Sequence, residues 1–322
     1  MVTASGDRTA RVWREAKNGT WDSTSLEGHN WAVTAAAFSV DGTRIITASG
    51  DKTARVWREA EDGTWDGTPL QGHQLEVNDA AFSPDGTRIV TVSSDNTARV
   101  WRQAEDGTWD STPLEGHGGI VWFAAFSSDG TRIVTASGDK TARVWREAED
   151  GSWDSTPLNG HEDDVNSVAF SPDGTRIVTA SDDKTARVWR ESEYGSWTST
   201  SLEGHKGPVY STAFSPDGTH IVTASSDKTA RVWEVRLLAG DNDWAASDTR
   251  SRAVAVCLDQ MSHTSLLVED EETGEARRIF SNRIVTQEDA AAFPVLRDRI
   301  GYDVCSKHLN PPPWWHALLF WK

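Results

Sequence analysis

The pentapeptide Thr97-Ala98-Arg99-Val100-Trp101 decides the fold, because it recurs along the chain at one fixed interval. Its copies end at tryptophans that lie 44 residues apart, at Trp13, Trp57, Trp101, Trp145, Trp189 and Trp233. A Gly-His pair recurs at the same interval, from Gly28-His29 to Gly204-His205. A fixed period of this length indicates an array of similar structural units that stack on one another.

Each 44-residue unit predicts four short strands joined by tight turns. In the unit that begins at His73, the predicted strands are Val77–Phe82, Thr87–Ser93, Thr97–Arg102 and Trp109–Leu114. The turn at Asp85-Gly86 is a hairpin signal, since both residue types tolerate positive φ. No stretch shows the 3.6-residue apolar period that a helical solenoid needs. The sequence therefore predicts an all-β fold, a β-propeller built from four-stranded antiparallel blades.

Five blades are predicted to be complete within a propeller domain at 1–250, namely 29–72, 73–116, 117–160, 161–204 and 205–248. Residues 1–28 would supply three strands of a partial blade, and residues 251–322 leave the repeat. Two alternatives stay open for that region. Strands at Ala253–Cys257, Ser265–Val268 and Ala276–Phe280 would form a degenerate blade, which gives seven blades and is favoured, with imperfect closure. A single closing strand at Arg252–Leu258 would give six.

The remaining tail is predicted to be short and irregular. Thr286–Ala292 is typical of a short helix capped by Thr286, and the segment Pro311–Trp321 is strongly apolar. That segment could dock on a partner or a membrane interface. The alternatives, which we favour, are that it packs on the propeller or results from an altered reading frame.

The order Gly-His, Ser-x-Asp-x-Thr and Trp resembles the WD-repeat family over residues 1 to about 240. One departure is that the repeated Trp is followed by arginine, as at Arg102, where the family has aspartate. The Trp-Asp pairs that do occur, such as Trp109-Asp110, fall eight residues later, near the start of the outer strand.

The resemblance implies a buried hydrogen-bond tetrad of His, a Ser or Thr hydroxyl, Asp and Trp in each blade. Alternation along a strand puts two hydroxyl residues on one face, so both stay candidates. The candidate residues are His29, Thr47, Ser49, Asp51, Trp57, His73, Thr91, Ser93, Asp95, Trp101, His117, Thr135, Ser137, Asp139, Trp145, His161, Thr179, Ser181, Asp183, Trp189, His205, Thr223, Ser225, Asp227 and Trp233. Five copies of one His-hydroxyl-Asp set indicate a fold device, whereas a catalytic triad is a single site. We therefore predict a protein that is not an enzyme and needs no cofactor.

The blades differ mainly just after Gly-His and at the residue before the tetrad Asp. In a WD-repeat propeller these positions map to the top face, around the channel mouth. The Ala-Glu-Asp-Gly turn, present in three units, hardly varies although it should be equally exposed. The predicted partner-binding residues are Trp31, Leu75, Trp122, Phe123, Glu162, Asp163, Asp164, Lys206 and Tyr210.

These positions predict a non-catalytic scaffold or sensor module that binds a protein or peptide on the top face. The alternative is an enzyme or a lectin-like small-ligand binder at the channel mouth, where Glu162-Asp163-Asp164 is the one unrepeated polar cluster. The close similarity of the repeats resembles bacterial and fungal arrays that act as sensor ends of signalling ATPases or kinases. We expect a monomer or a part of such a larger chain, although no Gly-x-x-x-x-Gly-Lys loop occurs here.

Charge and cysteine content limit the partners and the compartment. The formal net charge of −17 at pH 7 disfavours nucleic acid as a ligand and allows a preference for basic partners. Two cysteines, Cys257 and Cys305, make no disulfide framework, so we expect a cytoplasmic protein. With His263 and His308 they match no known metal-ligand spacing. No apolar run is long enough to cross a membrane, and residues 1–5 match the repeat rather than a signal peptide.

Overall fold

The computed structural model describes residues 1–235, 252–258, 264–269, 276–280 and 283–285, with side chains placed in 1–235. The described residues form β-strands and no helix, which confirms the predicted all-β class. The chain divides into two compact units, Met1–Pro157 and Leu158–Lys322. No helix in the described ranges is long and apolar enough to span a membrane.

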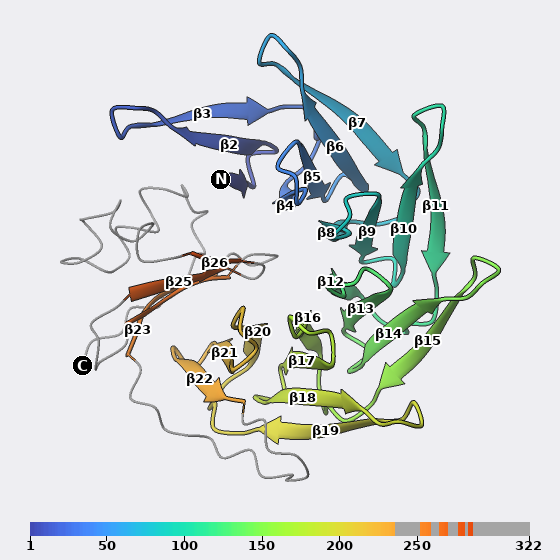
Figure 1. The fold of residues 1–322 in the computed structure, drawn as a ribbon, viewed down its shortest axis with the longest axis vertical. Helices are drawn as coiled ribbons and strands as arrows, with labels where there is room; N and C mark the ends of the chain where they lie inside the picture. The colour runs from blue at the N-terminus through green and yellow to red at the C-terminus, as the bar shows by residue number, and fades with distance from the viewer. Residues whose placement is uncertain (236–251, 259–263, 270–275, 281–282, 286–322) are drawn as a thin grey trace. The chain divides into compact units, whose positions relative to one another are not determined.

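The first unit holds one three-stranded and three four-stranded antiparallel sheets (Figure 1). The strands are β1 (Val2–Ala4), β2 (Ala10–Glu15), β3 (Trp21–Leu26), β4 (Val33–Phe38), β5 (Arg44–Ser49), β6 (Thr53–Glu59), β7 (Trp65–Gln71), β8 (Val77–Phe82), β9 (Arg88–Ser93), β10 (Ala98–Gln103), β11 (Trp109–Leu114), β12 (Val121–Phe126), β13 (Arg132–Ser137), β14 (Ala142–Glu147) and β15 (Trp153–Leu158). Each sheet keeps the sequence order of its strands, so it is a simple meander.

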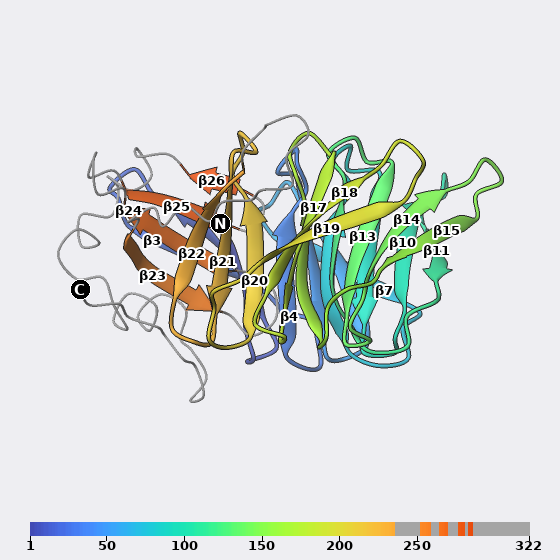
Figure 2. The same cartoon turned by 90° about the horizontal axis from the view of Figure 1, so that it is seen from below.

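The second unit repeats this plan. Its strands are β16 (Val165–Phe170), β17 (Arg176–Ser181), β18 (Ala186–Glu191), β19 (Trp197–Leu202), β20 (Val209–Phe214), β21 (His220–Ser225), β22 (Ala230–Glu234), β23 (Arg252–Leu258), β24 (Thr264–Glu269), β25 (Ala276–Phe280) and β26 (Arg283–Val285). They form the sheets β16–β19, β20–β22 and β23–β26. The sheets twist, as expected for β-structure, and Figure 2 shows the outer strand β19 crossing the direction of β17.

The strands of the unit at 73–116 lie within one residue of their predicted positions. The carboxylate of Asp85 fixes the first turn, because it accepts hydrogen bonds from the Ser83 hydroxyl and, at 3.0 Å, from the Thr87 N–H. Gly86 then adopts a φ of 69°, which glycine reaches without the strain of a side chain. The second turn places Asn96 in the same left-handed region, with a φ of 68°.

Successive sheets of the first unit stack face to face, with the inner strands β4, β8 and β12 next to one another. One buried cluster joins Ile46 and Val56 of one sheet to Ala80, Ile89 and Trp101 of the next. Apolar burial between neighbours is therefore the main stabilising contribution, as in other repeat arrays.

In the first unit, Arg44 and Arg88, each at the start of the strand after an Asp-Gly turn, also link neighbouring sheets. Arg44 Nη2 donates to the Gly86 carbonyl at 2.6 Å, and its guanidinium lies 5.1 Å from the Phe82 ring centroid. Arg88 repeats this pattern with Gly130, at 2.7 Å, and with Phe126. The Thr-Arg step therefore connects sheet β4–β7 to β8–β11 and sheet β8–β11 to β12–β15.

The chain departs from the regular repeat after β22. The strand at Arg252–Leu258 pairs with β24 in a four-stranded sheet of its own, so it does not complete the three-stranded sheet β1–β3. The fourth strand predicted for 205–248, the helix at Thr286–Ala292 and the apolar segment Pro311–Trp321 lie outside the described residues.

Candidate binding surface

A buried chain of side chains links the strands of sheet β4–β7. The Trp57 indole Nε1 donates to Thr47 Oγ1 at 2.9 Å. Thr47 Oγ1 lies 2.7 Å from His29 Nε2, and His29 Nδ1 lies 2.9 Å from Asp51 Oδ2. His29, Thr47 and Trp57 are buried. Threonine is therefore the tetrad hydroxyl, and Ser49 is not.

The same tetrad recurs in the four other predicted blades, with Thr91, Thr135, Thr179 and Thr223 as the hydroxyl residues. The Trp-to-Thr distances are 2.8–2.9 Å, the Thr-to-His distances 2.7–2.8 Å and the His-to-Asp distances 2.7–3.0 Å. The geometry repeats so closely that no one copy stands out as a reaction centre.

The Thr47 hydroxyl accepts the indole N–H and has two acceptors within reach, His29 Nε2 at 2.7 Å and the Arg55 carbonyl at 3.5 Å. We assign its hydrogen to the much shorter contact, with His29 Nε2. His29 is then neutral and donates its Nδ1–H to Asp51. Burial lowers the pKa of His29 against the opposing effect of Asp51, which agrees with a neutral ring. Burial raises the pKa of Asp51, but hydrogen bonds from Thr53, the Asn30 N–H and His29 outweigh it and lower the pKa.

The tetrad also holds the loop that follows Gly-His. The Asn30 N–H donates to Asp51 Oδ2 at 2.9 Å, and the Ser49 hydroxyl donates to the Trp31 carbonyl at 3.2 Å. The Gly50 N–H donates to the Ala32 carbonyl at 3.0 Å. The variable loop and the variable residue before the tetrad Asp are therefore adjacent and joined by hydrogen bonds. Blade 73–116 repeats these bonds at Gln74, Leu75 and Glu76.

The glycine of Gly-His is required by a close approach. Gly28 has a φ of 151°, and a Cβ added there would lie 3.2 Å from Arg55 Nη1 and 3.4 Å from Trp57 Cη2. The arginine and tryptophan of the Thr-Ala-Arg-Val-Trp string thus pack against the Gly-His loop of their own blade. This contact connects the two sequence signatures that first revealed the repeat.

We call the blade ends that carry these loops the top face of each unit. On the first unit, Trp31 is 59% exposed and Leu75 is 48% exposed, at matching positions of adjacent blades. Trp122 and Phe123 are half-buried. Trp31 lies directly over Gly50, since a Cβ added to Gly50 would come within 2.4 Å of Trp31 Cδ1. A larger residue before Asp51 would displace this indole.

On the second unit the top face is mixed in character. Glu162, Asp163 and Lys206 are exposed, Asp164 is half-buried and Tyr210 is 44% exposed. The Asn166 amide donates to Asp182 Oδ1 at 2.6 Å and to the Val209 carbonyl at 3.1 Å. These bonds connect the acidic blade end to the strand that carries Tyr210.

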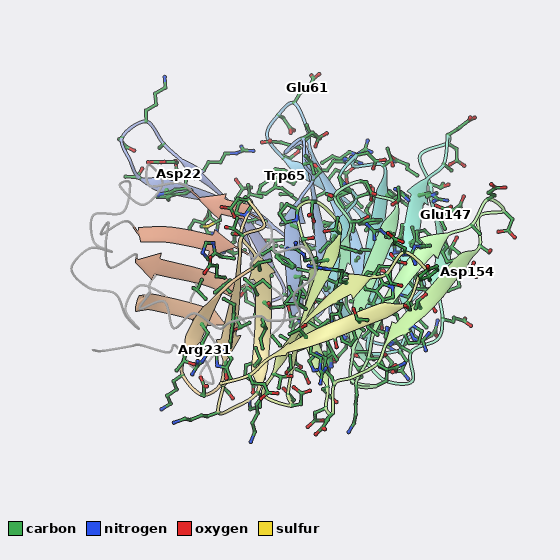
Figure 3. All side chains as sticks on the ribbon, turned by 60° about the horizontal axis from the view of Figure 1, so that its bottom comes forward. Asp22, Glu61, Trp65, Glu147, Asp154 and Arg231 are labelled. Atoms are coloured by element: carbon green, nitrogen blue, oxygen red, sulfur yellow. The ribbon has the colours of Figure 1, made fainter. Side chains whose placement is uncertain are left out.

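The most exposed aromatic side chain of the described residues was not among the predicted partner-binding residues. Tyr194 is 94% exposed at the tip of the β18–β19 hairpin. In the β6–β7 hairpin, Asp62 occupies the position of Tyr194 and accepts hydrogen bonds from the Thr64 N–H and hydroxyl. In the β18–β19 hairpin, the Ser192 and Ser196 hydroxyls instead bond to each other at 2.7 Å. The other described hairpins have Asp or Asn at this position, so the change to Tyr194 was the available signal. Figure 3 shows a matching hairpin of the first unit, β6–β7, with Glu61 near its tip.

Metal binding finds no support in the described part of the chain, where no three His, Cys, Asp or Glu residues are grouped to hold an ion. The side chains of Cys257, His263, Cys305 and His308 lie outside it.

Replacing Asp139 by alanine should cost about 1–3 kcal/mol of stability, because it leaves buried His117 and the Gly118 N–H without their acceptor. Denaturant unfolding measures the loss. The control is Asp154→Ala, on the outer strand β15 (Figure 3), which should change stability by less than about 0.5 kcal/mol. Equal losses in the two variants would contradict the tetrad assignment.

Successive four-stranded antiparallel sheets, each held by a Trp-Thr-His-Asp chain, are blades of a β-propeller. A family model described as "WD domain, G-beta repeat" matches residues 22–58, 64–102, 110–146, 151–190 and 196–234. The chain therefore belongs to the WD-repeat family. Proteins of this family generally act as protein-interaction scaffolds and are typically not catalytic. No curated protein matches the chain.

The matched repeats are offset from the sheets. The repeat at 64–102 begins with β7, the outer strand of one sheet, and ends in β10, the third strand of the next. Each sequence repeat therefore spans parts of two neighbouring blades.

Proposed function

We propose that this chain is an interaction module whose top face binds a protein or peptide. The observation that carries the proposal is the exposure of Trp31 and Leu75 on loops held by the tetrads. Large apolar side chains exposed on a rigid surface are unfavourable in water unless a partner covers them. Because their backbone is already fixed, binding would cost little conformational entropy at these loops.

The variation between blades supports the same proposal. The tetrads and turns are nearly identical from blade to blade, whereas the residues that project from the loops differ in size and charge. A surface of this kind combines a constant frame with individual contact residues. Aromatic anchors such as Trp31 and Tyr210 are the residue types that contribute most to binding energy at protein interfaces.

The test begins by selecting peptides from a displayed random library on the intact chain, followed by affinity measurements on the selected peptide. Trp31→Ala should weaken binding by about 2 kcal/mol, which is roughly thirtyfold. The matched control is Val40→Ser, an exposed apolar residue beside an Asp-Gly turn at the end of β4 away from its Gly-His loop. Unchanged affinity in Trp31→Ala, or an equal loss in Val40→Ser, would refute the top-face proposal.

The negative charge on the top face of the second unit should affect the rate at which a basic peptide associates with the chain. We propose that Glu162, Asp163 and Asp182 favour basic partners. Asp163→Lys should slow association with a basic selected peptide and reduce the dependence of its rate on salt, while dissociation changes little. Stopped-flow measurements at two salt concentrations test this, with Glu149→Lys on the β14–β15 hairpin as the control. An identical effect of both charge reversals would indicate net charge alone, and would contradict a local role for Asp163.

A further inference from the structure

Asp79 is a buried acid that the binding surface does not use. It lies in β8, it is 4% exposed, and its Oδ2 accepts a long hydrogen bond of 3.4 Å from the Ala124 N–H of β12. The matching positions of the other blades hold Ala35, Phe123, Ser167 and Ser211, none of which carries a charge. The carboxyl is therefore a feature of this one blade and not of the repeat.

Asp79 lies at a β-bulge that recurs at the matching position of the inner strands β4, β12, β16 and β20. The register between β8 and β9 shifts between Val77 and Asp79, which interrupts the simple alternation of the strand. Asn78 is buried as well, and its amide donates to the Val121 carbonyl of β12 at 2.8 Å. We call the contact of Asn78 and Asp79 with Val121 and Ala124 the β8–β12 junction.

The surroundings supply no positive charge for Asp79. The strands β4 and β12, which pack against β8, contain no titratable residue. In β5 and β9 the charged residues are Arg44 and Arg88, which start their strands and donate to the Gly86 and Gly130 carbonyls. The charged residues of β6 also have other partners: Arg55 contacts Gly67, Arg58 contacts Gln103, and Glu59 contacts Arg14. Between β7 and β8, His73 pairs with Asp95, and Glu76 is exposed to solvent.

An unpaired carboxylate in such a position is costly, because burial removes its hydration without replacing it by a cation. Burial raises the pKa of Asp79 to about 7, and the N–H groups of Ala124 and Ala80 only partly oppose this shift. The folded state thus holds its proton more tightly than the unfolded chain does. The stabilisation that the Asp79 carboxyl contributes is full below the ordinary aspartate pKa, and it is lost as the pH rises through about 7.

We propose that the β8–β12 junction is a pH-sensitive contact, which is closed while Asp79 carries a proton and loosens when its carboxyl ionises. The neighbouring junction between β4 and β8 offers a control within the same unit. There Ala35 occupies the position of Asp79, and the Thr34 hydroxyl donates to the Val77 carbonyl at 2.7 Å. That contact has no titratable group and should not respond to pH. The proposal is independent of what the top face binds.

The test is native-state amide hydrogen exchange on the intact chain, corrected for the intrinsic effect of pH on exchange. The opening constant at Ala124 and its neighbours in β12 should rise at least about tenfold between about pH 5.5 and about pH 8. The opening constant in β4 should stay level. Asp79→Asn should abolish the rise at β12, because the amide keeps the shape of the side chain without its titration.

A second variant covers the case in which the asparagine disturbs packing. Asp79→Ser copies the junction at Ser167, whose hydroxyl oxygen accepts the Thr212 N–H at 3.4 Å. A level opening constant at β12 in the parent chain would overturn the proposal. So would a rise of equal size that persists in both variants, since the titrating group would then be another residue.

Discussion

Replacing Trp145 by alanine should destabilise the protein by about 3–5 kcal/mol, because it removes a large buried ring and leaves a cavity between two sheets. Trp145 is 1% exposed and packs against Val90, Val100 and Leu114 of the preceding sheet. Its indole N–H also donates to Thr135 at 2.9 Å. Both losses fall on the contact between neighbouring blades, so sheets β8–β11 and β12–β15 should loosen first.

Hydrogen exchange resolved by residue, together with denaturant unfolding, measures this effect. Trp145→Phe should retain most of the burial and lose mainly the hydrogen bond, at a cost of about 1–3 kcal/mol. Trp31→Ala is the control on the surface, since that ring is largely exposed and should affect binding rather than unfolding. If Trp145→Ala and Trp31→Ala proved equally stable, the repeated tryptophan would not be the core residue of the blade.

Acid should unfold the blades through the tetrads. The folded state depresses the pKa of the tetrad carboxyls, to about 2 at Asp227, where hydrogen bonds from Thr229, Lys206 and His205 outweigh the opposing effect of burial. These groups bind fewer protons in the folded chain than in the unfolded one. Their stabilisation is therefore present above about pH 4 and is lost as the pH falls towards 2. Each tetrad Asp should contribute about 1–2 kcal/mol, allowing for partial solvation.

Two of the tetrad histidines, His29 and His205, act in the same direction. Burial lowers the pKa of His29 and of His205. The folded chain resists protonating them, so some stability is lost as the pH falls below about 6.5. Urea midpoints measured from pH 7 to pH 3 should decrease throughout in the Asp79→Asn variant, which lacks the opposing titration at the β8–β12 junction. A midpoint that rises between pH 5 and pH 3 in that variant would contradict the proton positions given for the tetrads.

The sequence predicted the blades well because their signals are local and repeated. Gly-His, Asp-Gly and Trp recur at one spacing, and each has a direct structural cause, such as the close approach of Arg55 and Trp57 to Gly28. The choice between Thr47 and Ser49 could not be made from alternation, since both lie on one face. The structure distinguishes the two hydroxyls by their hydrogen-bond partners. The Thr47 hydroxyl lies between the Trp57 indole and the His29 imidazole, whereas the Ser49 hydroxyl donates to the Trp31 carbonyl.

Burial at the variable positions was harder to predict. Trp31 and Trp122 are both variable aromatics, yet one is largely exposed and the other half-buried. The difference depends on packing between segments far apart in the sequence. The burial of Asp79 was not predicted for a related reason, since the bulge after Val77 interrupts the simple alternation of the strand. Tyr194 could have been found by comparing the hairpin turns one by one.

The most direct test of the proposed binding function is a hydrogen-exchange footprint of the intact chain with and without a saturating selected peptide. We expect slower exchange at the loops Asn30–Ala32 and Gln74–Glu76 of the first unit, whose side chains would contact the peptide. Exchange should be unchanged at the Asp-Gly turns and at the β6–β7 and β14–β15 hairpins. Protection confined to those turns or hairpins, with the Gly-His loops unaffected, would show that the partner binds elsewhere and would contradict the proposed role of the top face.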